Sequence, residues 1–308
     1  MVKVLLDSNK EIYLDGYLKS ALDSLAYNIN KDWDFVIVVT GDGMVRTGKS
    51  VLAMTVAAYL SHLTKTTFDI NHVHFDSQSM IDLAQTSPQN SVFVYDEARE
   101  GLASAKRFSK VQQDLIDFFN ECGQLNQIFI LVLPDYFGLN WELATNRSEC
   151  LLNVYRKERN IMGRLKGTKE KIPLTVFDRG YFEFYNRKKK SDLFWKAKRA
   201  GLRNYGMVKS NFVGSFTNNY PIDETLYREK KREALKRFND KHKEEKVKRI
   251  SMGERAGYVA LTKLKERGEN FSKLGTDLGH SDGYFKEAFK SLKKKIEKDV
   301  YNSDIDAI

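Results

Sequence analysis

The sequence of 308 residues contains few cysteines and no long hydrophobic run. Cys122 and Cys150 lie far apart, without metal-binding spacing, and therefore indicate buried thiols in a reducing compartment. No apolar stretch reaches the roughly 18 residues that a membrane-spanning helix requires, and residues 1–7 are too short for a signal sequence. We therefore expect a cytoplasmic protein without a membrane span.

Acidic residues are scarce in the second half of the chain compared with basic ones. Residues 1–160 carry 15 Lys and Arg against 20 Asp and Glu, whereas the remainder carries 36 against 21. A strongly basic half favours a polyanionic partner, nucleic acid first, although solvated lysine-rich helices would give the same count. The length predicts about two domains.

An apolar strand pattern at residues 36–40 leads into a glycine-rich turn and then into an apolar helix pattern. Gly43, Gly48, Lys49 and Ser50 fit the phosphate-binding loop G-x-x-x-x-G-K-S/T. Glycines let backbone N–H groups point at an anion, and the helix start adds its positive end. The sequence therefore predicts ATP binding by Gly43, Met44, Val45, Arg46, Thr47, Gly48, Lys49, Ser50 and Val51.

Four side chains are expected to act on the bound nucleotide. Lys49 would reach its β- and γ-phosphates, and the Ser50 hydroxyl would coordinate Mg²⁺. A second motif, Asp96 followed by Glu97, ends an apolar strand at the edge where ligands bind in parallel sheets. Asp96 would hold Mg²⁺, directly or through water, and Glu97 would orient the attacking water. A glutamate in this position favours hydrolysis over kinase chemistry or signalling.

Two further residues are candidates for the catalytic site. Asp135 follows the apolar strand 127–133, where it either senses the γ-phosphate or caps the strand. Arg147 is a candidate arginine finger that would reach a neighbouring subunit's nucleotide, with Arg99 and Arg107 as competitors. For each arginine, an ordinary surface position is the alternative.

The phosphate loop, Asp96–Glu97, residues 133–135 and residues 146–147 resemble, in order and spacing, the additional-strand catalytic-glutamate ATPases. Within that class they are most similar to phage and viral ATPases of the FtsK/HerA branch, including those called zonular-occludens-toxin-like. The resemblance covers residues 10 to 155, approximately. Branch members often carry a glutamine at the end of the fourth strand, where this chain has Leu133-Pro134-Asp135. The resemblance implies a homo-oligomeric ring, commonly a hexamer, that moves or packages DNA.

Residues 158–190 predict a β-rich stretch, with a turn at 163–167 and strands at 174–177 and 180–185. Basic residues interleave there with Tyr181 and Tyr185. Either this stretch and Trp195 contact a nucleic-acid backbone, or a hairpin packs on the ATPase body. Residues 223–248 read as a charged connecting helix.

The C-terminal stretch predicts a short helix, a turn at 279–282 and a longer basic helix, which is a helix-turn-helix pattern. A small helical hairpin for protein contact is the alternative. As a DNA-binding unit it would hold duplex DNA largely by backbone contacts. Its candidate DNA-binding residues are Lys273, Ser281, Asp282, Lys286, Lys290, Lys293 and Lys294.

These patterns predict an α/β protein with a P-loop NTPase parallel sheet, flanked by helices, at residues 1–158. A β-rich basic extension at 159–220, a charged helical linker at 221–249 and a helix-turn-helix domain at 250–308 would follow. The leading hypothesis is an ATPase that acts as a DNA motor of viral or mobile-element type, in genome packaging or translocation, in the host cytoplasm if viral. A replication initiator or helicase loader, and an assembly or secretion ATPase with a viral or other protein partner, are the alternatives.

Overall fold

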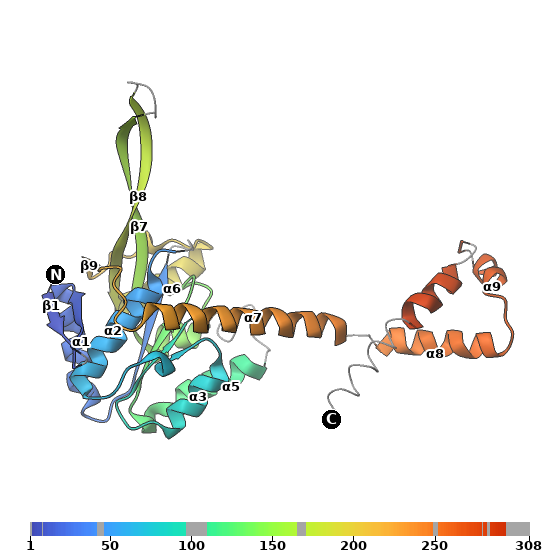
Figure 1. Ribbon diagram of the computed structural model, residues 1–308, viewed down its shortest axis with the longest axis horizontal. Coiled ribbons are helices and arrows are strands. Elements are labelled where there is room, and N and C mark those ends of the chain that lie inside the picture. The colour runs from blue at the N-terminus through green and yellow to red at the C-terminus, as the bar shows by residue number, and fades with distance from the viewer. Residues whose placement is uncertain are drawn as a thin grey trace. The chain divides into compact units, whose positions relative to one another are not determined.

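The computed structural model describes residues 2–7, 9–41, 46–96, 110–164, 171–248, 252–278, 280–281 and 284–293. The chain forms two compact units, Met1–Lys231 and Arg232–Ile308. Figure 1 shows the elements of each unit. No helix within the described ranges is long and apolar enough to cross a membrane.

A seven-stranded, mostly parallel sheet organises the first unit, with the strand order β4-β5-β6-β3-β7-β8-β9. The parallel strands are β3 (Phe35–Gly41), β4 (Val73–His74), β5 (Val92–Tyr95), β6 (Ile128–Val132) and the start of β7 (Ser148–Arg164). The antiparallel strands are β8 (Lys171–Asn186) and β9 (Phe212–Ser215). This is the mixed α/β fold, with a mostly parallel central sheet, that the sequence predicted.

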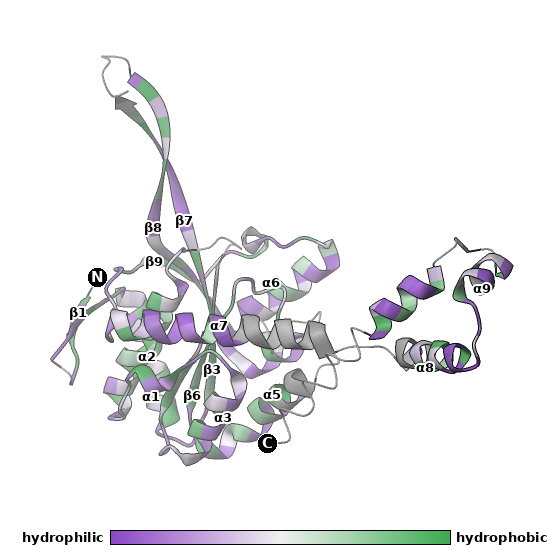
Figure 2. Ribbon diagram, turned by 45° about the vertical axis from the view of Figure 1, so that its right-hand side comes forward, coloured by the Kyte–Doolittle hydropathy of each residue, from purple (hydrophilic) through white to green (hydrophobic). Residues whose placement is uncertain are grey.

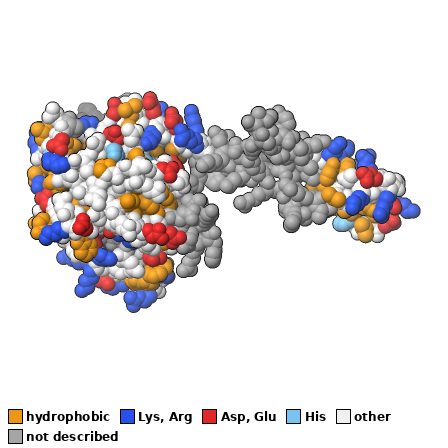
Figure 3. Space-filling view, turned by 90° about the horizontal axis from the view of Figure 1, so that it is seen from below, with side chains coloured by type: hydrophobic (Ala, Val, Ile, Leu, Met, Phe, Trp, Pro, Cys, Tyr) orange, Lys and Arg blue, Asp and Glu red, His pale blue; other side chains and the backbone are white. Residues whose placement is uncertain are grey.

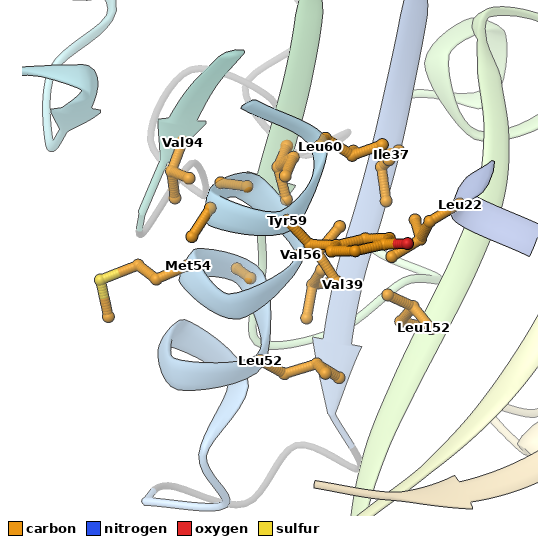
Figure 4. Close-up of a cluster of buried hydrophobic side chains, with 14 of the residues drawn as sticks. Leu22, Ile37, Val39, Leu52, Met54, Val56, Tyr59, Leu60, Val94 and Leu152 are labelled. Carbon is orange, nitrogen blue, oxygen red and sulfur yellow. The ribbon is translucent and has the colours of Figure 1, made fainter. Parts of the chain in front are cut away.

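Helices cover both faces of β3, and every one of its residues is buried. Ile37 and Val39 pack in the core formed with α1 (Gly16–Ile29) and α2 (Lys49–Thr64), as Figure 4 shows on the α2 side. Val36 and Val38 point to the opposite core. That core is formed with α3 (Ser77–Thr86), α5 (Lys110–Glu121) and α6 (Arg187–Ala200). A strand with apolar residues at successive positions is typical of a parallel sheet covered on both faces.

The N-terminal residues form a hairpin of β1 (Val2–Leu5) and β2 (Glu11–Leu14) before α1 begins. The apolar spacing of residues 10–30 predicts one or two helices, and the first part of this prediction is wrong. Ile12 and Leu14 are buried on alternate positions of β2, which is the strand period. Asp15 then caps α1, because its carboxylate accepts hydrogen bonds from the backbone N–H groups of Tyr17 and Leu18.

Two further predictions are confirmed: the residue types at 76–79 predict a helix start, and the two cysteines were expected to be buried. Asp76 caps α3 by accepting a hydrogen bond from the Ser79 N–H at 2.9 Å. Cys122 and Cys150 are free and buried. Burial raises the pKa of both thiols to about 12, which makes them unreactive at neutral pH.

β7 and β8 form a much longer hairpin than the sequence predicted. Their antiparallel register runs from the Cys150–Asn186 pair to the Arg164–Lys171 pair. The inner half lies in the sheet between β3 and β9, and the outer half extends from the body as a two-stranded ribbon (Figure 1). The boundary that the sequence analysis drew at residue 159 therefore cuts through one hairpin, and β8 and β9 complete the sheet of the nucleotide-binding half.

A bulge marks the point where the hairpin leaves the sheet. The register shifts between Tyr155 and Lys157, opposite Gly180, which has a φ of +90°. The carbonyl of Gly180 accepts a hydrogen bond from the Phe216 N–H at 2.8 Å. A Cβ atom on Gly180 would lie 2.5 Å from the Phe216 carbonyl oxygen, so glycine is required by both backbone conformation and space.

The remaining elements connect the sheet strands or follow them. Short turns of helix cover Ile70–His72, Cys122–Leu125 and Tyr205–Met207, and a π-helical turn covers Leu143–Arg147. The charged helix that the sequence predicted is α7 (Glu224–Lys248).

The second unit contains α8 (Met252–Glu266), α9 (Phe271–Asp277) and a helix at residues 284–293. The Phe289 ring packs against Tyr258 and Phe271, with centroid distances of 5.4 and 5.8 Å. The sequence predicts a helix that closes at Arg267-Gly268, and Asn270 or Ser272 as the cap of the next helix. In the structure α8 ends before Gly268, which has a φ of +77°, and Asn270 caps α9. The turn residues Gly279, Asp282 and Gly283 lie outside the described residues.

We expect Gly180→Ala to lower the free energy of unfolding by roughly 3 kcal/mol, because the positive φ and the collision with Phe216 add. Gly201→Ala is the matched control: Gly201 has a φ of +66° but nothing lies within 4 Å of its Cβ position. Its cost should be about 1 kcal/mol. Urea unfolding measures both, and equal losses would contradict the close approach at Gly180.

Candidate functional site

The phosphate loop joins β3 to α2 at the carboxyl edge of the parallel sheet. Gly48 precedes α2 with a φ of +99°, and Lys49 is the first residue of that helix. The Lys49 Nζ lies 3.4 Å from Thr47 Oγ1 and 3.2 Å from the Cβ position of Gly41, so its side chain folds back across the base of the loop. A cation there can meet a phosphate group that the loop holds.

The other predicted loop residues contribute in different ways. Arg46 is exposed and has a φ of +61°, whereas Val51 is buried in the core beneath α2. Val51 therefore offers only its backbone to a ligand. Gly43, Met44 and Val45 lie outside the described residues.

Asp96 lies at the carboxyl end of β5 and is almost completely buried. One further strand, β6, separates β5 from the loop-bearing β3. The Asp96 N–H donates to the His74 carbonyl at 2.8 Å, which fixes the backbone at the strand end. Its carboxylate Oδ2 accepts hydrogen bonds from the Tyr227 hydroxyl at 2.5 Å and from the Lys231 Nζ at 3.2 Å. The neighbouring Glu97 lies outside the described residues.

Ser50 and Asp96 offer the oxygen ligands that Mg²⁺ prefers. Both interact with the same Tyr227 hydroxyl, so their oxygens converge on one small volume. Burial, and then the charge of Asp96, raise the pKa of Tyr227, while hydrogen bonding with Ser50 acts in the opposite sense. A hydroxyl and a carboxylate that share one hydrogen-bonding partner could together hold a magnesium ion, which would neutralise phosphate charge there.

Tyr227 and Lys231 were not recognised as site residues in the sequence. Both lie on the first turns of α7, four residues apart and therefore on one face of the helix. The sequence shows only a thin apolar seam in a charged helix, and no local pattern connects it with Asp96. The Lys231 ammonium lies beside the carboxylate that a magnesium ion would use.

Two more residues of the second half reach the loop. The Tyr205 hydroxyl donates to the Gly41 carbonyl at 3.0 Å and contacts Thr40 Oγ1 at 3.2 Å. The Phe216 ring lies 3.1 Å from the Cβ position of Gly48, so a side chain at residue 48 would press against it. The candidate site is therefore built by both halves of the sequence within the first unit.

Asp135 forms two local contacts. Its Oδ1 accepts a hydrogen bond from the Phe137 N–H at 3.2 Å, and its Oδ2 pairs with Arg203 at 2.8 Å. The contact with Phe137 is the capping interaction that the sequence analysis gave as one alternative. The γ-phosphate-sensing role stays a prediction.

Arg147 lies at the edge of the sheet opposite the phosphate loop. Ser148, the next residue, pairs with Val36 at the start of β3, whereas the loop follows the end of that strand. The Arg147 guanidinium donates to the Phe119 carbonyl and to the Asp34 carboxylate. This geometry gives Arg147 a structural role within its own chain rather than that of an exposed finger. Arg99 and Arg107 lie outside the described residues.

Most of the predicted DNA-binding residues are exposed in the second unit. Lys and Arg side chains stand out on its described surface, with acidic and hydrophobic ones between them (Figure 3). The exposed candidates are Lys273, Ser281, Lys286, Lys290 and Lys293. Asp282 and Lys294 lie outside the described residues.

No protein-family model and no curated protein matches the chain. Among solved structures, the crystal structure of the N-terminal domain of zonular occludens toxin from Neisseria meningitidis is similar to it. The two share 11% identity and a TM-score of 0.35, over 64% of this chain and 98% of that chain. Because this TM-score is low, the conclusions below rest on the chain's own residues. Those residues define a helix-flanked α/β domain that is consistent with a P-loop NTPase.

We expect Arg147→Met to lower the free energy of unfolding by about 3 kcal/mol, because it leaves Asp34 largely buried without its cation. Arg187→Met removes an exposed ion pair with Glu149 and should cost no more than about 0.5 kcal/mol. Urea unfolding compares the two variants. Unchanged stability with lost hydrolysis in Arg147→Met would instead support the finger role.

Lys231→Gln should tighten the binding of magnesium-bound nucleotide by about fivefold or more, because a competing cation leaves the Asp96 carboxylate. Titration of a fluorescent ATP analogue measures this, and the gain should disappear when Mg²⁺ is chelated. Lys236→Gln, at an exposed position on the same helix, is the matched control. Weaker binding in Lys231→Gln would show that Lys231 contacts the nucleotide itself.

Proposed function

We propose that the chain is an ATP-hydrolysing DNA motor of viral or mobile-element type, which acts as a ring of identical subunits in genome packaging or translocation. One observation carries the nucleotide part of this proposal: Ser50, at the start of α2, and Asp96, after β5, both interact with the Tyr227 hydroxyl. The strand β6 lies between β5 and β3, and this order supports the resemblance to the additional-strand ATPases.

Hydrolysis follows from the residue after Asp96. Glu97 directly follows Asp96 in the sequence, and its carboxylate would accept a proton from a water molecule that attacks the γ-phosphate. Lys49 and the ion held by Ser50 and Asp96 would stabilise the charge on the phosphate oxygens. In this proposal Glu97 activates water, and Lys49 together with the ion stabilises the phosphate charge.

DNA is the proposed partner because the second half of the sequence carries the positive excess. Lys263, Lys265, Lys273, Lys286, Lys290 and Lys293 are exposed among the described residues of the second unit. Polyanion binding by such surfaces is driven by counterion release and needs little base recognition. The helix at residues 284–293 contains no Arg, Asn or Gln, which favours backbone contacts.

The separate basic unit also supports a second candidate function. A replication initiator or helicase loader would use the second unit to find an origin, and sequence-specific binding by this unit would favour that function. Hydrolysis that is indifferent to DNA would favour an assembly or secretion ATPase with a protein partner.

Glu97→Gln should lower the turnover number for ATP at least about a hundredfold, because it removes the carboxylate that activates water. We expect duplex DNA to stimulate hydrolysis severalfold in the wild-type chain and not in this variant. Steady-state phosphate release with and without DNA measures both effects.

Glu11→Gln, at an exposed position on the β1–β2 hairpin, is the control and should behave like the wild type. Retained nucleotide binding in Glu97→Gln would show that chemistry, and not the fold, is lost. Good basal hydrolysis that no form of DNA alters would exclude the motor. Stimulation that survives truncation after Lys248 would place the motor contacts in the first unit.

A further inference from the structure

The outer half of the β7–β8 hairpin has no neighbouring strand among the described residues. We call residues 156–164 and 171–179 the outer ribbon. β3 pairs with β7 only as far as Val154, and β9 pairs with β8 only from Tyr181 to Phe184. The outer ribbon therefore has two free edges and two exposed faces (Figure 1). A two-stranded ribbon in water is marginally stable by itself. The outer ribbon therefore adds little to the stability of the fold, and its length indicates a function.

The outer ribbon is strongly basic. It carries six Lys and Arg but only two acidic residues. One of the acidic residues, Asp178, is already paired with Arg159 at 3.2 Å. The surplus of positive charge favours a polyanionic partner.

The positive charges lie on both faces of the outer ribbon. The Lys157 Nζ lies 3.9 Å from the centre of the Tyr181 ring, and the Arg156 guanidinium lies 4.5 Å from the centre of the Phe177 ring. Successive residues of a strand point to opposite faces, so Arg156 and Lys157 lie on opposite faces of the outer ribbon. A protein partner that docks on a sheet meets one face only, and gives no reason for cations on the other.

Apolar side chains are exposed along the same element. Ile161, Met162, Leu174 and Phe177 are between 39% and 64% exposed. Ile161 faces Leu174 across the strands, and Met162 faces Pro173, so each face carries one apolar pair near the tip. Figure 2 shows hydrophobic and hydrophilic residues interspersed along the ribbon. Exposed apolar groups of this kind mark an interaction site.

The dimensions fit a groove of duplex DNA. The major groove of B-DNA is about 12 Å wide and admits a two-stranded β-ribbon. At about 3.3 Å per residue, the stretch from Lys157 to Arg164 spans roughly 23 Å. Inside a groove, both faces of a ribbon meet a wall of phosphates, and the tip meets base edges. The cations on both faces match the phosphates, and the apolar pairs toward the tip match the base edges.

A lipid surface fits less well. Insertion into a membrane would place apolar side chains at the tip and cations behind them. The pair Arg164–Lys171 lies instead beyond both apolar pairs, and Phe177 lies near the base of the outer ribbon under the guanidinium of Arg156. Apolar and basic residues are therefore mixed along its length.

We propose that the outer ribbon enters a groove of duplex DNA, where Lys157, Lys171 and Arg179 contact phosphates and the Met162 side of the tip lies against the bases. The inference rests on the proposed function for its choice of DNA as partner. It does not depend on hydrolysis.

A position-specific cross-link tests the placement in the full-length chain. Met162→Cys puts a thiol at the ribbon tip, while Cys122 and Cys150 are buried. With a duplex that carries a disulfide-linked tether on a base, the cross-linking yield should exceed that of Lys65→Cys, an exposed control position on the body, at least fivefold. Unmodified duplex should compete. Equal yields at the two positions would overturn the proposal.

Charge removal gives an independent measurement. The triple variant Lys157→Gln/Lys171→Gln/Arg179→Gln should bind a duplex about tenfold more weakly, and the slope of log affinity against log salt should fall by about two to three. The matched control Lys3→Gln/Lys31→Gln/Lys65→Gln removes the same charge from exposed positions outside the ribbon. Equal losses of duplex affinity in both triple variants would overturn the proposal. So would a ribbon variant that loses binding to anionic lipid vesicles but keeps its affinity for the duplex.

The outcomes separate this proposal from the proposed function. A ribbon that cross-links and carries the salt dependence, in a chain whose hydrolysis ignores DNA, supports the ribbon and excludes the motor. DNA-stimulated hydrolysis that the ribbon substitutions leave unchanged, with no cross-link at residue 162, excludes the ribbon and supports the motor. A wild-type chain that binds no duplex excludes both.

Discussion

The burial of β3 between two hydrophobic layers is the constraint on which the rest of the first unit depends. Ile37 and Val39 pack on one side and Val36 and Val38 on the other, while β6 and β7 take up the hydrogen-bonding groups along both edges. The strand has no freedom to slide, because a shift of one residue would exchange the two faces. Gly41, the last residue of β3, is thereby placed at the carboxyl edge, where Asp96 also follows the end of the parallel β5.

The parts of the site that depend on local sequence could be predicted. The phosphate loop, the strand that ends at Asp96 and the cap at Asp76 are each specified by neighbouring residues, and the structure contains the described parts of all three. Tyr227 and Lys231 could not be predicted, since their partner Asp96 lies more than 130 residues earlier in the chain. The partner of Arg147, Asp34, could not be predicted either, since it lies 113 residues earlier in the chain.

The length of the β7–β8 hairpin escaped prediction for a related reason. Strand patterns are recognised by alternating burial, as at Phe182 and Phe184 in the inner half. The outer ribbon has no core to face, so only residues 174–177 within it were recognised as a strand, and its full length was not. Its strands are held by each other, and by the bulge at Gly180 that turns them out of the sheet. Hydrophobic alternation reflects burial on one face, so it does not identify a ribbon that is exposed on both faces.

The buried carboxylate of Asp96 connects the nucleotide site with α7. A carboxylate out of contact with water is costly unless a cation or hydrogen-bond donors satisfy it, and here Lys231 and Tyr227 do so. A magnesium ion would satisfy the same oxygens, so the two arrangements compete. By linkage, if the contact of Lys231 lowers the affinity for the metal by some factor, the bound metal weakens the contact of Lys231 by the same factor. A magnesium ion at Asp96 would therefore weaken the contact of Lys231 with that carboxylate, and this competition requires no conformational change in the sheet.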